Sequence, residues 1–170
     1  MIFRYLFKFF NCIPAGNNFN SIIVRFKCYI AKVIFKSIGD KVNFQQGIKI
    51  NGPYSNISIG NNSGLGKNST LHAQGGISIG SNVMIGQELI IHTARHNIYI
   101  GIPMIEQGST YRPVTIGNNV WIGSRVTILP GVKIQDNIVI GAGSVVTKNL
   151  CDSGVYAGNP ARFIKELESR

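Results

Sequence analysis

A repeat of six residues in the second half of the chain restricts its fold more than any other feature. An aliphatic residue occupies every sixth position, and an apolar or small residue follows each one four positions later. A period of six fits neither the 3.6 residues per turn of a helix nor the alternation of a strand. It is typical of a β-helix in which a short strand and a turn repeat as one unit. The aliphatic positions are Ile116, Ile122, Ile128, Ile134, Ile140 and Val146, and the second positions are Val120, Val126, Val132, Ile138, Ser144 and Leu150.

The same pattern is present earlier in the chain, although less regularly. It is loose from Val42 and strict from Ile57, and two extra residues around Gly75 and Gly76 shift its phase. Three hexads make a triangular turn, so that about 18 residues form one coil and neighbouring coils stack ~4.8 Å apart. The sequence therefore predicts an all-β fold, a parallel β-helix of about five coils over residues 42–157.

The repeat is interrupted between residues 92 and 113. The inward position after Ile91 would hold Arg95, and a packed aliphatic core does not accept an unpaired guanidinium group. The regular pattern returns only at Ile116. An insertion of about 20 residues in a compact repeat is usually functional. This one contains two of the three histidines of the chain, His92 and His96.

Both ends of the chain are predicted to be helical. In the basic, apolar segment 1–41, residues 21–38 place cations at roughly helical spacing. Two functions fit this segment and are compatible: it covers the open end of the β-helix core, or it lies on an anionic membrane surface. The apolar run at the N-terminus is too short to span a bilayer and lacks the features of a signal peptide. At the other end, Asn159 and Pro160 form a typical helix start, which predicts a short helix within residues 158–170.

Charge and cysteine content narrow the class of protein. The formal net charge is +10, and residues 1–49 contribute +7 of it, with eight Lys and Arg against Asp40. The basicity therefore belongs mainly to the N-terminus and does not form a nucleic-acid-binding motif. Cys12, Cys28 and Cys151 have no spacing that suggests disulfides or a zinc site. This pattern favours a location in the reducing cytoplasm. If the basic segment contacts lipid, the protein would lie peripherally at the inner face of the membrane.

Three stretches together resemble a known family: IPMIEQGSTYRPVTIGNNVWIGSRVTILPGVKI, VIGAGSVVTK and AGNPARFIKE. They are similar to the hexapeptide-repeat acyltransferases, and most similar to the sugar and polysaccharide O-acetyltransferases related to the maltose and galactoside acetyltransferases. The resemblance covers roughly residues 40–168 and is most specific over 92–165. It implies a left-handed parallel β-helix, a homotrimer with active sites between subunits, and acetyl-CoA as the acetyl donor.

The resemblance also assigns the catalytic groups. It implies that His96 is a general base that takes the proton of the acceptor hydroxyl, which then attacks the thioester directly in a ternary complex. A neutral imidazole suits this task near neutral pH. The backbone N–H of Ser124 would stabilise the oxyanion that forms. Trp121 occupies an outward position, where we expect it to wall the site or to pack at a subunit interface.

Donor and acceptor positions follow from the same resemblance. The phosphates and adenine of coenzyme A require hydrogen-bond donors and cations along a groove. Lys165 replaces an arginine that is frequent in relatives, which keeps the charge but loses bidentate geometry. The alternative is that these cations only keep the surface soluble, and that the acceptor candidates are solvated turn or loop residues. The donor candidates are Trp121, Ser124, the backbone of Ala142, Thr147, Lys148, Arg162 and Lys165, and the acceptor candidates are His72, Gln74, His92 and Glu106.

The sequence thus predicts an acetyl-CoA-dependent O-acetyltransferase that acts on a sugar or polysaccharide, with a lipid-linked precursor suggested by the basic, apolar N-terminus. A xenobiotic acetyltransferase acting on an antibiotic hydroxyl would share His96 and the donor groove. A β-helical carbonic anhydrase would hold zinc with His72, His92 and His96 but would not need the donor motifs; we predict no metal site. A non-catalytic scaffold would not bind acetyl-CoA.

Overall fold

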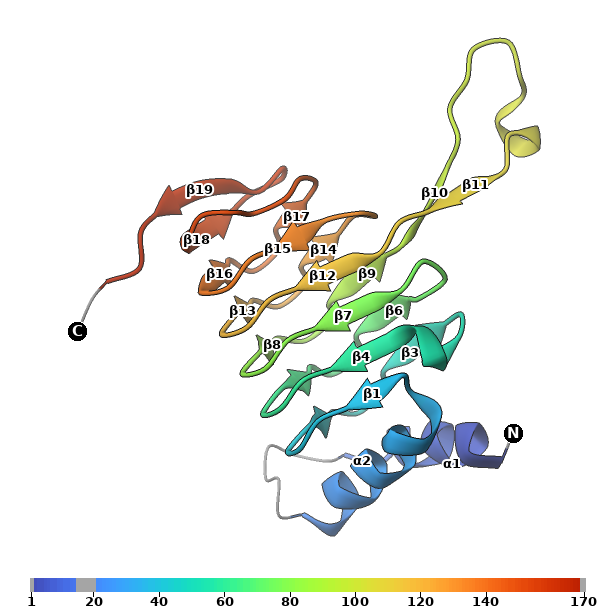
Figure 1. The fold of residues 1–170 in the computed structure, drawn as a ribbon, viewed down its shortest axis with the longest axis vertical. Helices are drawn as coiled ribbons and strands as arrows, with labels where there is room; N and C mark the ends of the chain where they lie inside the picture. Colours follow the sequence, from blue (N-terminus) through green and yellow to red (C-terminus); the bar gives the residue numbers. More distant parts are fainter. Residues whose placement is uncertain (1, 15–20, 169–170) are drawn as a thin grey trace.

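The computed structural model describes residues 2–14 and 21–168. Residues 1, 15–20 and 169–170, which belong to the predicted terminal segments 1–41 and 158–170, lie outside this part. The described chain forms a parallel β-solenoid of about six turns with two helices at its N-terminal end (Figure 1). The sequence predicted about five coils beginning at Val42. The first strand begins at Ser37, five residues before this predicted start.

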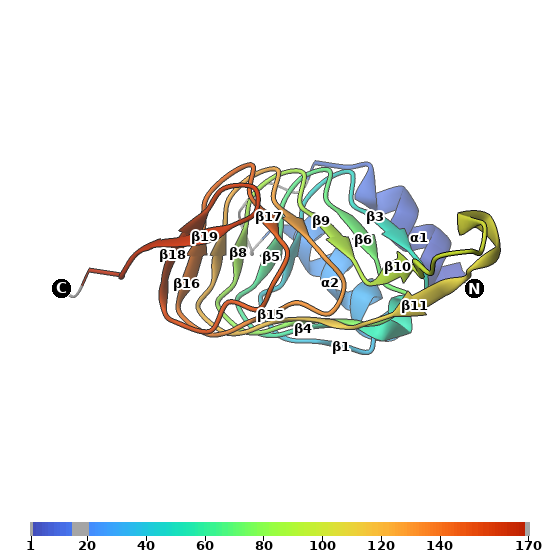
Figure 2. The same cartoon turned by 90° about the horizontal axis from the view of Figure 1, so that it is seen from above.

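Three parallel sheets form the walls of the solenoid. Seen from above, its coils follow one another as a staggered stack (Figure 2). The first sheet contains β1 (Ser37–Ile38), β4 (Ile57–Ile59), β7 (Ile77–Ile79), β12 (Val114–Ile116) and β15 (Lys133–Ile134). The second contains β2 (Asn43–Phe44), β5 (Gly64–Leu65), β8 (Met84–Ile85), β13 (Trp121–Ile122), β16 (Ile138–Ile140) and β18 (Gly154–Ala157), with β19 (Arg162–Lys165) at its edge. The third contains β3 (Lys49–Asn51), β6 (Thr70–His72), β9 (Ile90–His92), β14 (Thr127–Ile128) and β17 (Val145–Val146).

The hexad positions form the core, as the period predicted. All six aliphatic positions from Ile116 to Val146 are at most 2% exposed, and the second positions are buried as well. Ser144 occupies one of these positions because its hydroxyl donates to the carbonyl of Gly141 at 2.6 Å, so no buried hydroxyl is left unpaired. The predicted phase shift is also confirmed, since Ile57 pairs with Ile77 across 20 residues whereas Ile116 pairs with Ile134 across 18.

Two helices close the N-terminal end of the core, α1 (Ile2–Asn11) and α2 (Ile22–Ile34). The ring of Phe7 on α1 makes edge contacts with the rings of Phe35, Phe44 and Tyr54, with centroids 5.3–5.9 Å apart. A short 3-10 turn, η1 (Tyr54–Asn56), places that tyrosine. The capping role predicted for this segment is therefore confirmed. Within the described residues, no helix has the length and apolar character needed to cross a bilayer.

Lys27 is the one charged side chain among the fully buried residues of α2. Its Nζ donates hydrogen bonds to the carbonyl of Ile13 at 2.8 Å and to that of Phe44 at 3.3 Å. Burial lowers the pKa of this amine, an effect that Cys12 opposes in part. Lys27 thus connects α2 to the first coil by satisfying two carbonyls at the open end of the core.

The predicted insertion leaves the solenoid as an antiparallel ribbon. Its strands are β10 (Ala94–His96) and β11 (Ser109–Tyr111), and the turn η2 (Met104–Glu106) lies near its tip. Arg95 is exposed on the ribbon rather than buried in the core. The solenoid resumes at Val114, which pairs with Ile77 across 37 residues. Figure 1 shows the ribbon projecting well beyond the coils.

The predicted C-terminal helix is wrong. After a cis Asn159-Pro160 bond the chain forms the extended strand β19, which pairs antiparallel with β18. Helix-start signals at Asn159 and Pro160 are local, whereas β18 offers an unpaired row of backbone groups that β19 satisfies. The ring of Phe163 also packs edge-on against that of Tyr156, with centroids 5.4 Å apart. Arg162 and Lys165 therefore do not share a helix face.

Candidate functional site

The ribbon exposes His96 at the end of β10. His96 is opposite Ser109 in the ribbon register, and its Nδ1 lies 3.3 Å from the Ser109 hydroxyl oxygen. Glu106, one of the acceptor candidates and the only carboxylate of the insertion, belongs to η2 and is exposed. The structure thus gives His96 a hydroxyl neighbour that the sequence did not reveal, because the pairing register of a ribbon is not visible in its residue pattern.

The ribbon is held together by polar side chains. The Gln107 amide donates to the carbonyls of Tyr99 at 3.0 Å and Ile102 at 2.7 Å and accepts from the Tyr99 N–H. Asn97 donates to the Gln107 carbonyl at 2.9 Å. The ribbon therefore has its own internal order, even though its apolar side chains pack against little. The large exposed side chains are Ile98, Tyr99, Ile100, Ile102, Met104 and Ile105, and we call them the ribbon tip.

His72 and His92 lie one coil apart on the third sheet. They are register partners, and their rings stack with centroids 4.8 Å apart and an interplanar angle of 10°. Asn51 lies one coil before His72, with its side-chain amide nitrogen 3.4 Å from Nδ1 of His72. Burial, and secondarily the neighbouring His72, lowers the pKa of His92. The structure thus brings together two acceptor candidates and adds Asn51, a third polar group that was not predicted from the sequence.

Gln74 follows His72 in the turn after β6. Its carbonyl accepts a hydrogen bond from the Asn56 side chain at 3.1 Å. Thr93, buried at the base of the ribbon, donates to the His72 carbonyl at 2.5 Å and accepts from the Gly75 N–H at 2.8 Å. These bonds fix the backbone of the turn that follows His72 at the end of β6. Within the described chain, no group of three or more His, Cys, Asp or Glu side chains is arranged to hold a metal ion.

A shallow hollow on the second sheet gathers three of the donor candidates. It encloses about 350 Å³ and is lined by Trp121, Ser124 and Ala142 together with Gly86 and Val139. Trp121 is 53% exposed and forms one wall. A side chain at Gly86 would lie 2.6 Å from the Ser124 nitrogen, so only glycine fits there. Gly86 lies one coil before Gly123 and was not among the residues predicted from the sequence.

The corner at Ser124 has an unused backbone donor. In the preceding coil, the Gln87 N–H donates to the Ser124 hydroxyl at 3.3 Å. One coil further along, the equivalent residue is Ala142, and its methyl group offers no acceptor to the Ser124 N–H. No other acceptor in the described chain takes this hydrogen bond. Ser124 lines the hollow, and its N–H has no protein partner, as a donor to an oxyanion would.

The cationic donor candidates lie towards the C-terminal end of the same sheet. Trp121, Val139, Val155 and Lys165 are successive register partners across β13, β16, β18 and β19. Three strand spacings separate the first from the last, a span of about 14 Å. Lys165 forms an exposed ion pair with Glu168 at 3.0 Å, and such a pair opens at little cost.

Arg162 lies on β19 at the end of this row, whereas Thr147 and Lys148 follow β17 at the corner between the third sheet and the first. Arg162 is exposed at the start of β19, with its guanidinium 3.2 Å from the carbonyl of Ala161. The Ala161 N–H donates to the Val145 carbonyl on β17 at 2.8 Å, which places the β19 segment against the third sheet. Thr147 and Lys148 follow β17 directly and are exposed.

Within one chain, His96 and the Trp121 hollow are on opposite sides. Both views show the β10–β11 ribbon leaving the solenoid away from the sheet that contains β8, β13 and β16 (Figures 1 and 2). A single chain therefore does not bring His96 and Ser124 together. A site that uses both needs a second copy of the chain.

Comparisons with known proteins agree with the repeat. A family model described as bacterial transferase hexapeptide (six repeats) matches residues 113–148, and one described as hexapeptide repeat of succinyl-transferase matches residues 56–91. Galactoside O-acetyltransferase from Escherichia coli (strain K12) is 44% identical over 117 residues, which are 68% of this chain. The chain spans only 57% of that relative's length.

Two solved structures have the same fold over nearly the whole chain. A maltose O-acetyltransferase from Clostridium difficile 630 superposes with a TM-score of 0.82 at 35% identity, covering 99% of this chain and 86% of that one. A galactoside acetyltransferase in complex with coenzyme A superposes with a TM-score of 0.79 at 33% identity, covering 96% and 78%.

Proposed function

The chain belongs to the hexapeptide-repeat acetyltransferases, and we propose that it transfers an acetyl group from acetyl-CoA to a hydroxyl of a sugar or polysaccharide. The observation that carries this proposal is the unpaired N–H of Ser124 in the Trp121 hollow. A backbone donor without a protein partner at a glycine-lined hollow suits the oxyanion of an acyl transfer. The coenzyme A complex of a structural relative supports the choice of donor.

The donor fits the row that runs from the hollow to β19. We propose that the thioester lies at Trp121 and Ser124, with the backbone of Ala142 beside it. Coenzyme A is long, and the ~14 Å row ends at cations that suit its phosphates. Arg162 and Lys165 supply these charges, and Thr147 and Lys148 of a neighbouring chain, from the corner where its ribbon also leaves the solenoid, would add a hydroxyl and a third cation.

The reaction needs one base and one oxyanion donor. His96 takes the proton from the acceptor hydroxyl, whose oxygen forms a bond to the thioester carbonyl carbon. The Ser124 N–H stabilises the negative oxygen of the tetrahedral intermediate. The C–S bond then breaks, and the imidazolium of His96 returns the proton to the coenzyme A sulfur. Ser109, 3.3 Å from Nδ1 of His96, orients the ring.

A homotrimer with left-handed coils, the arrangement that the family resemblance implies, would complete the site. We propose that the ribbon of one chain places its His96 at the Trp121 hollow of a neighbour. The apolar ribbon tip supports this arrangement, since an exposed patch of this kind marks a protein contact. Use of acetyl-CoA would place the reaction in the cytoplasm, where this thioester is available.

We assign the acceptor to the strip of the third sheet that holds Asn51, His72 and His92, with Gln74 and Glu106 as further candidates. Polar groups one coil apart suit a chain of sugar hydroxyls. A lipid-linked sugar, a free polysaccharide and an antibiotic all present such hydroxyls.

Labelled acetyl-CoA, offered with a panel of glycans, lipid-linked sugars and antibiotics, tests the proposal. The parent chain should transfer label to a sugar hydroxyl. His96→Ala should lower turnover by about 10²–10⁴-fold, the typical contribution of a general base, with donor affinity kept. Arg162→Ala should instead weaken donor binding by about 1–3 kcal/mol.

Other outcomes would contradict the proposal. Full turnover in His96→Ala would show that His96 is not the general base. Absence of acetyl-CoA binding by calorimetry would favour a scaffold. Stoichiometric zinc with CO₂ hydration that a chelator abolishes would favour the carbonic anhydrase alternative.

A further inference from the structure

The outer face of α2 carries an apolar stripe that does not face the core. Its residues follow one another at intervals of four, three and four, so they lie along one side of the helix. They are 41–82% exposed, whereas the opposite side of α2 is buried against the first coil. The stripe consists of Ile22, Phe26, Tyr29 and Val33, and the buried side of Val24, Lys27, Ile30 and Ala31.

The neighbouring helix α1 carries a similar stripe. Ile2, Tyr5 and Phe9 are spaced by three and four residues and are 65–67% exposed, while Phe7 is buried. The rings of Phe10 on α1 and Phe26 on α2 are in contact, with centroids 4.7 Å apart. Figure 1 shows the two helices packed together at the end of the solenoid. We call the two stripes together the cap face.

Cations accompany the cap face. The two helices contain no acidic residue. Arg4 and Lys8 are exposed on α1, and Arg25 and Lys32 on α2. A hollow of about 450 Å³ next to Tyr29 is lined by Arg25, Lys32 and Lys41.

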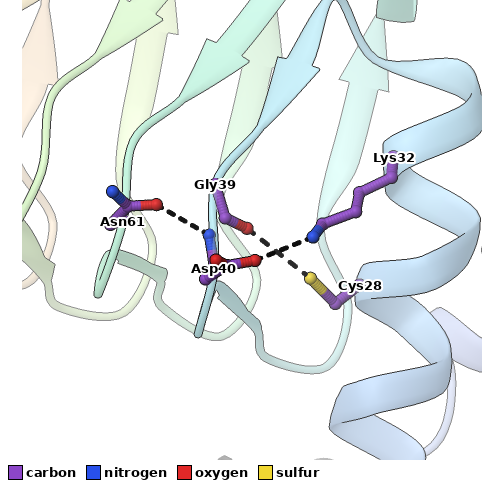
Figure 3. Close-up of polar contacts among 5 residues, drawn as sticks. All are labelled: Cys28, Lys32, Gly39, Asp40 and Asn61. Atoms are coloured by element: carbon purple, nitrogen blue, oxygen red, sulfur yellow. Dashed lines mark hydrogen bonds and ion pairs between the residues drawn. The ribbon is translucent and has the colours of Figure 1, made fainter.

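One acid adjoins this group of cations. The Asp40 carboxylate bonds the Lys32 amine at 2.9 Å (Figure 3). The Lys32 hydrogen bond holds the pKa of Asp40 below its ordinary value, so the carboxyl is ionised at neutral pH. The backbone N–H of Asp40 donates to the Asn61 side chain at 2.8 Å. The Cys28 thiol lies 3.9 Å from the carbonyl of the preceding residue, Gly39.

We propose that the cap face docks on the surface of an anionic lipid bilayer. The apolar stripes would enter the boundary between headgroups and acyl chains, and the flanking cations would meet the lipid phosphates. A second copy of the chain is a poorer occupant, since a two-fold contact brings the same cations together. This docking is independent of the proposed transferase activity, because none of its residues belongs to the donor or acceptor sites.

Docking would orient the solenoid with its N-terminal end on the membrane. His72 and His92 are one and two coils beyond β3, so they would stand within roughly 5–10 Å of the first coil. A sugar attached to a membrane lipid would lie within reach of this strip. An acceptor of that class follows if the transferase activity is confirmed as well.

Co-sedimentation of the full chain with vesicles tests the docking. One set is phosphatidylcholine alone, and the other mixes phosphatidylcholine and phosphatidylglycerol in equal parts. The parent chain should bind the mixed vesicles and not the neutral ones. Arg25→Gln with Lys32→Gln should lower the partition roughly 30-fold, at about fivefold per cation near the surface. Ile22→Gln with Val33→Gln should lower it by at least about tenfold, and glutamine keeps the helix propensity.

Two control pairs distinguish a loss of docking from a general effect of removing surface charge or apolar surface. Lys67→Gln with Lys133→Gln removes two exposed cations from the solenoid, and Ile164→Gln with Leu167→Gln removes two exposed apolar side chains from the C-terminal segment. Neither pair should change vesicle binding. Asp40→Asn should strengthen binding about fivefold, a gain that a damaged fold would not produce.

The proposal is overturned if the parent chain binds neither vesicle or binds both equally. It is also overturned if the control pairs reduce binding as much as the cap pairs. Self-association that Ile22→Gln with Val33→Gln abolishes, with no vesicle binding, would instead identify the cap face as a contact between copies.

Discussion

The cap face and the ribbon tip both expose large apolar side chains, but they differ in charge. Exposed cations Arg25 and Lys32 flank the α2 stripe of the cap face. Residues 97–108 of the ribbon contain a single charged residue, Glu106. An apolar surface among cations suits an anionic bilayer. An apolar surface with almost no charge suits the centre of a protein–protein contact, which is desolvated and contains few charged residues.

The two regions also differ in their attachment to the core. The cap face is the outer side of helices whose inner side is buried against the first coil. The ribbon tip is joined to the solenoid through two short strands, and its order comes from the bonds of Gln107. The cap therefore serves the fold and an outer partner at once, whereas the ribbon requires a partner to become buried.

The largest effect that separates the two regions is expected from Ile100→Asp with Ile105→Asp. Both side chains are almost fully exposed in the single chain, so the fold should tolerate the change. A carboxylate in an apolar contact lacks a partner. We expect assembly to weaken by at least about 100-fold, from ~1.5–3 kcal/mol for each lost isoleucine contact. Sedimentation velocity would show a monomer, and transferase activity would disappear.

The cap pair Ile22→Gln with Val33→Gln is the control, and it should leave the assembly unchanged. An unchanged sedimentation coefficient in the ribbon variant would show that the two surfaces do not differ in this way.

A second test concerns the core contact of the cap. Phe7→Ala removes a ring that touches three other aromatic rings and should lower the free energy of unfolding by about 3–5 kcal/mol. Phe9→Ala on the same helix removes an exposed ring and should change it by less than about 0.5 kcal/mol. Urea denaturation would measure both. Equal losses would mean that α1 is not oriented as described.

Much of the solenoid was predictable because its side-chain period reports packing directly. Each wall of a coil contains one hexad, whose aliphatic residue points into the core. The buried positions can therefore be found by counting every sixth residue. The 18-residue period also places Ala142 one coil after Ser124, at the position from which Ser124 itself offers its hydroxyl to the Gln87 N–H. Because alanine has no hydroxyl, the Ser124 N–H lacks the acceptor that the Gln87 N–H has. Residues of the first, looser coil were harder to place because their spacing there is 21 rather than 18.

Other features depend on contacts between distant residues. Asn159 and Pro160 predict a helix locally, but the free edge of β18 determines the outcome. The pairing of His96 with Ser109 depends on a register that the sequence does not encode visibly. The stacking of His72 on His92 was not predicted, although their 20-residue separation equals that of Ile57 and Ile77.

A third test uses salt. Charged contacts of the cap face should be screened as the Debye length falls from about 10 Å at 0.1 M to 3 Å at 1 M. We expect vesicle binding to decrease by roughly tenfold or more over this range. Assembly through the uncharged ribbon tip should not decrease. Sedimentation with and without vesicles measures both quantities, and equal salt sensitivity would remove the distinction between the two surfaces.

The smallest expected effect is the titration of His92, which lies on the third sheet between the cap and the ribbon. Burial, with a smaller contribution from His72, lowers its pKa from the ordinary value of 6.5. The unfolded chain therefore takes up a proton at this position at a higher pH than the folded chain does. It follows that the free energy of unfolding should decrease as the pH falls below 6.5, until the folded His92 is itself protonated.

Proton NMR of the imidazole rings would measure the pKa of His92 directly. His72→Gln should raise that pKa only in part, because burial is the larger cause. Vesicles should leave it unchanged, because the cap face and His92 belong to different elements. If vesicles shifted the titration, the bilayer would reach the third sheet, and the cap face would not be the whole docking surface. A pKa for His92 at or above 6.5 would mean that its ring is not buried against His72.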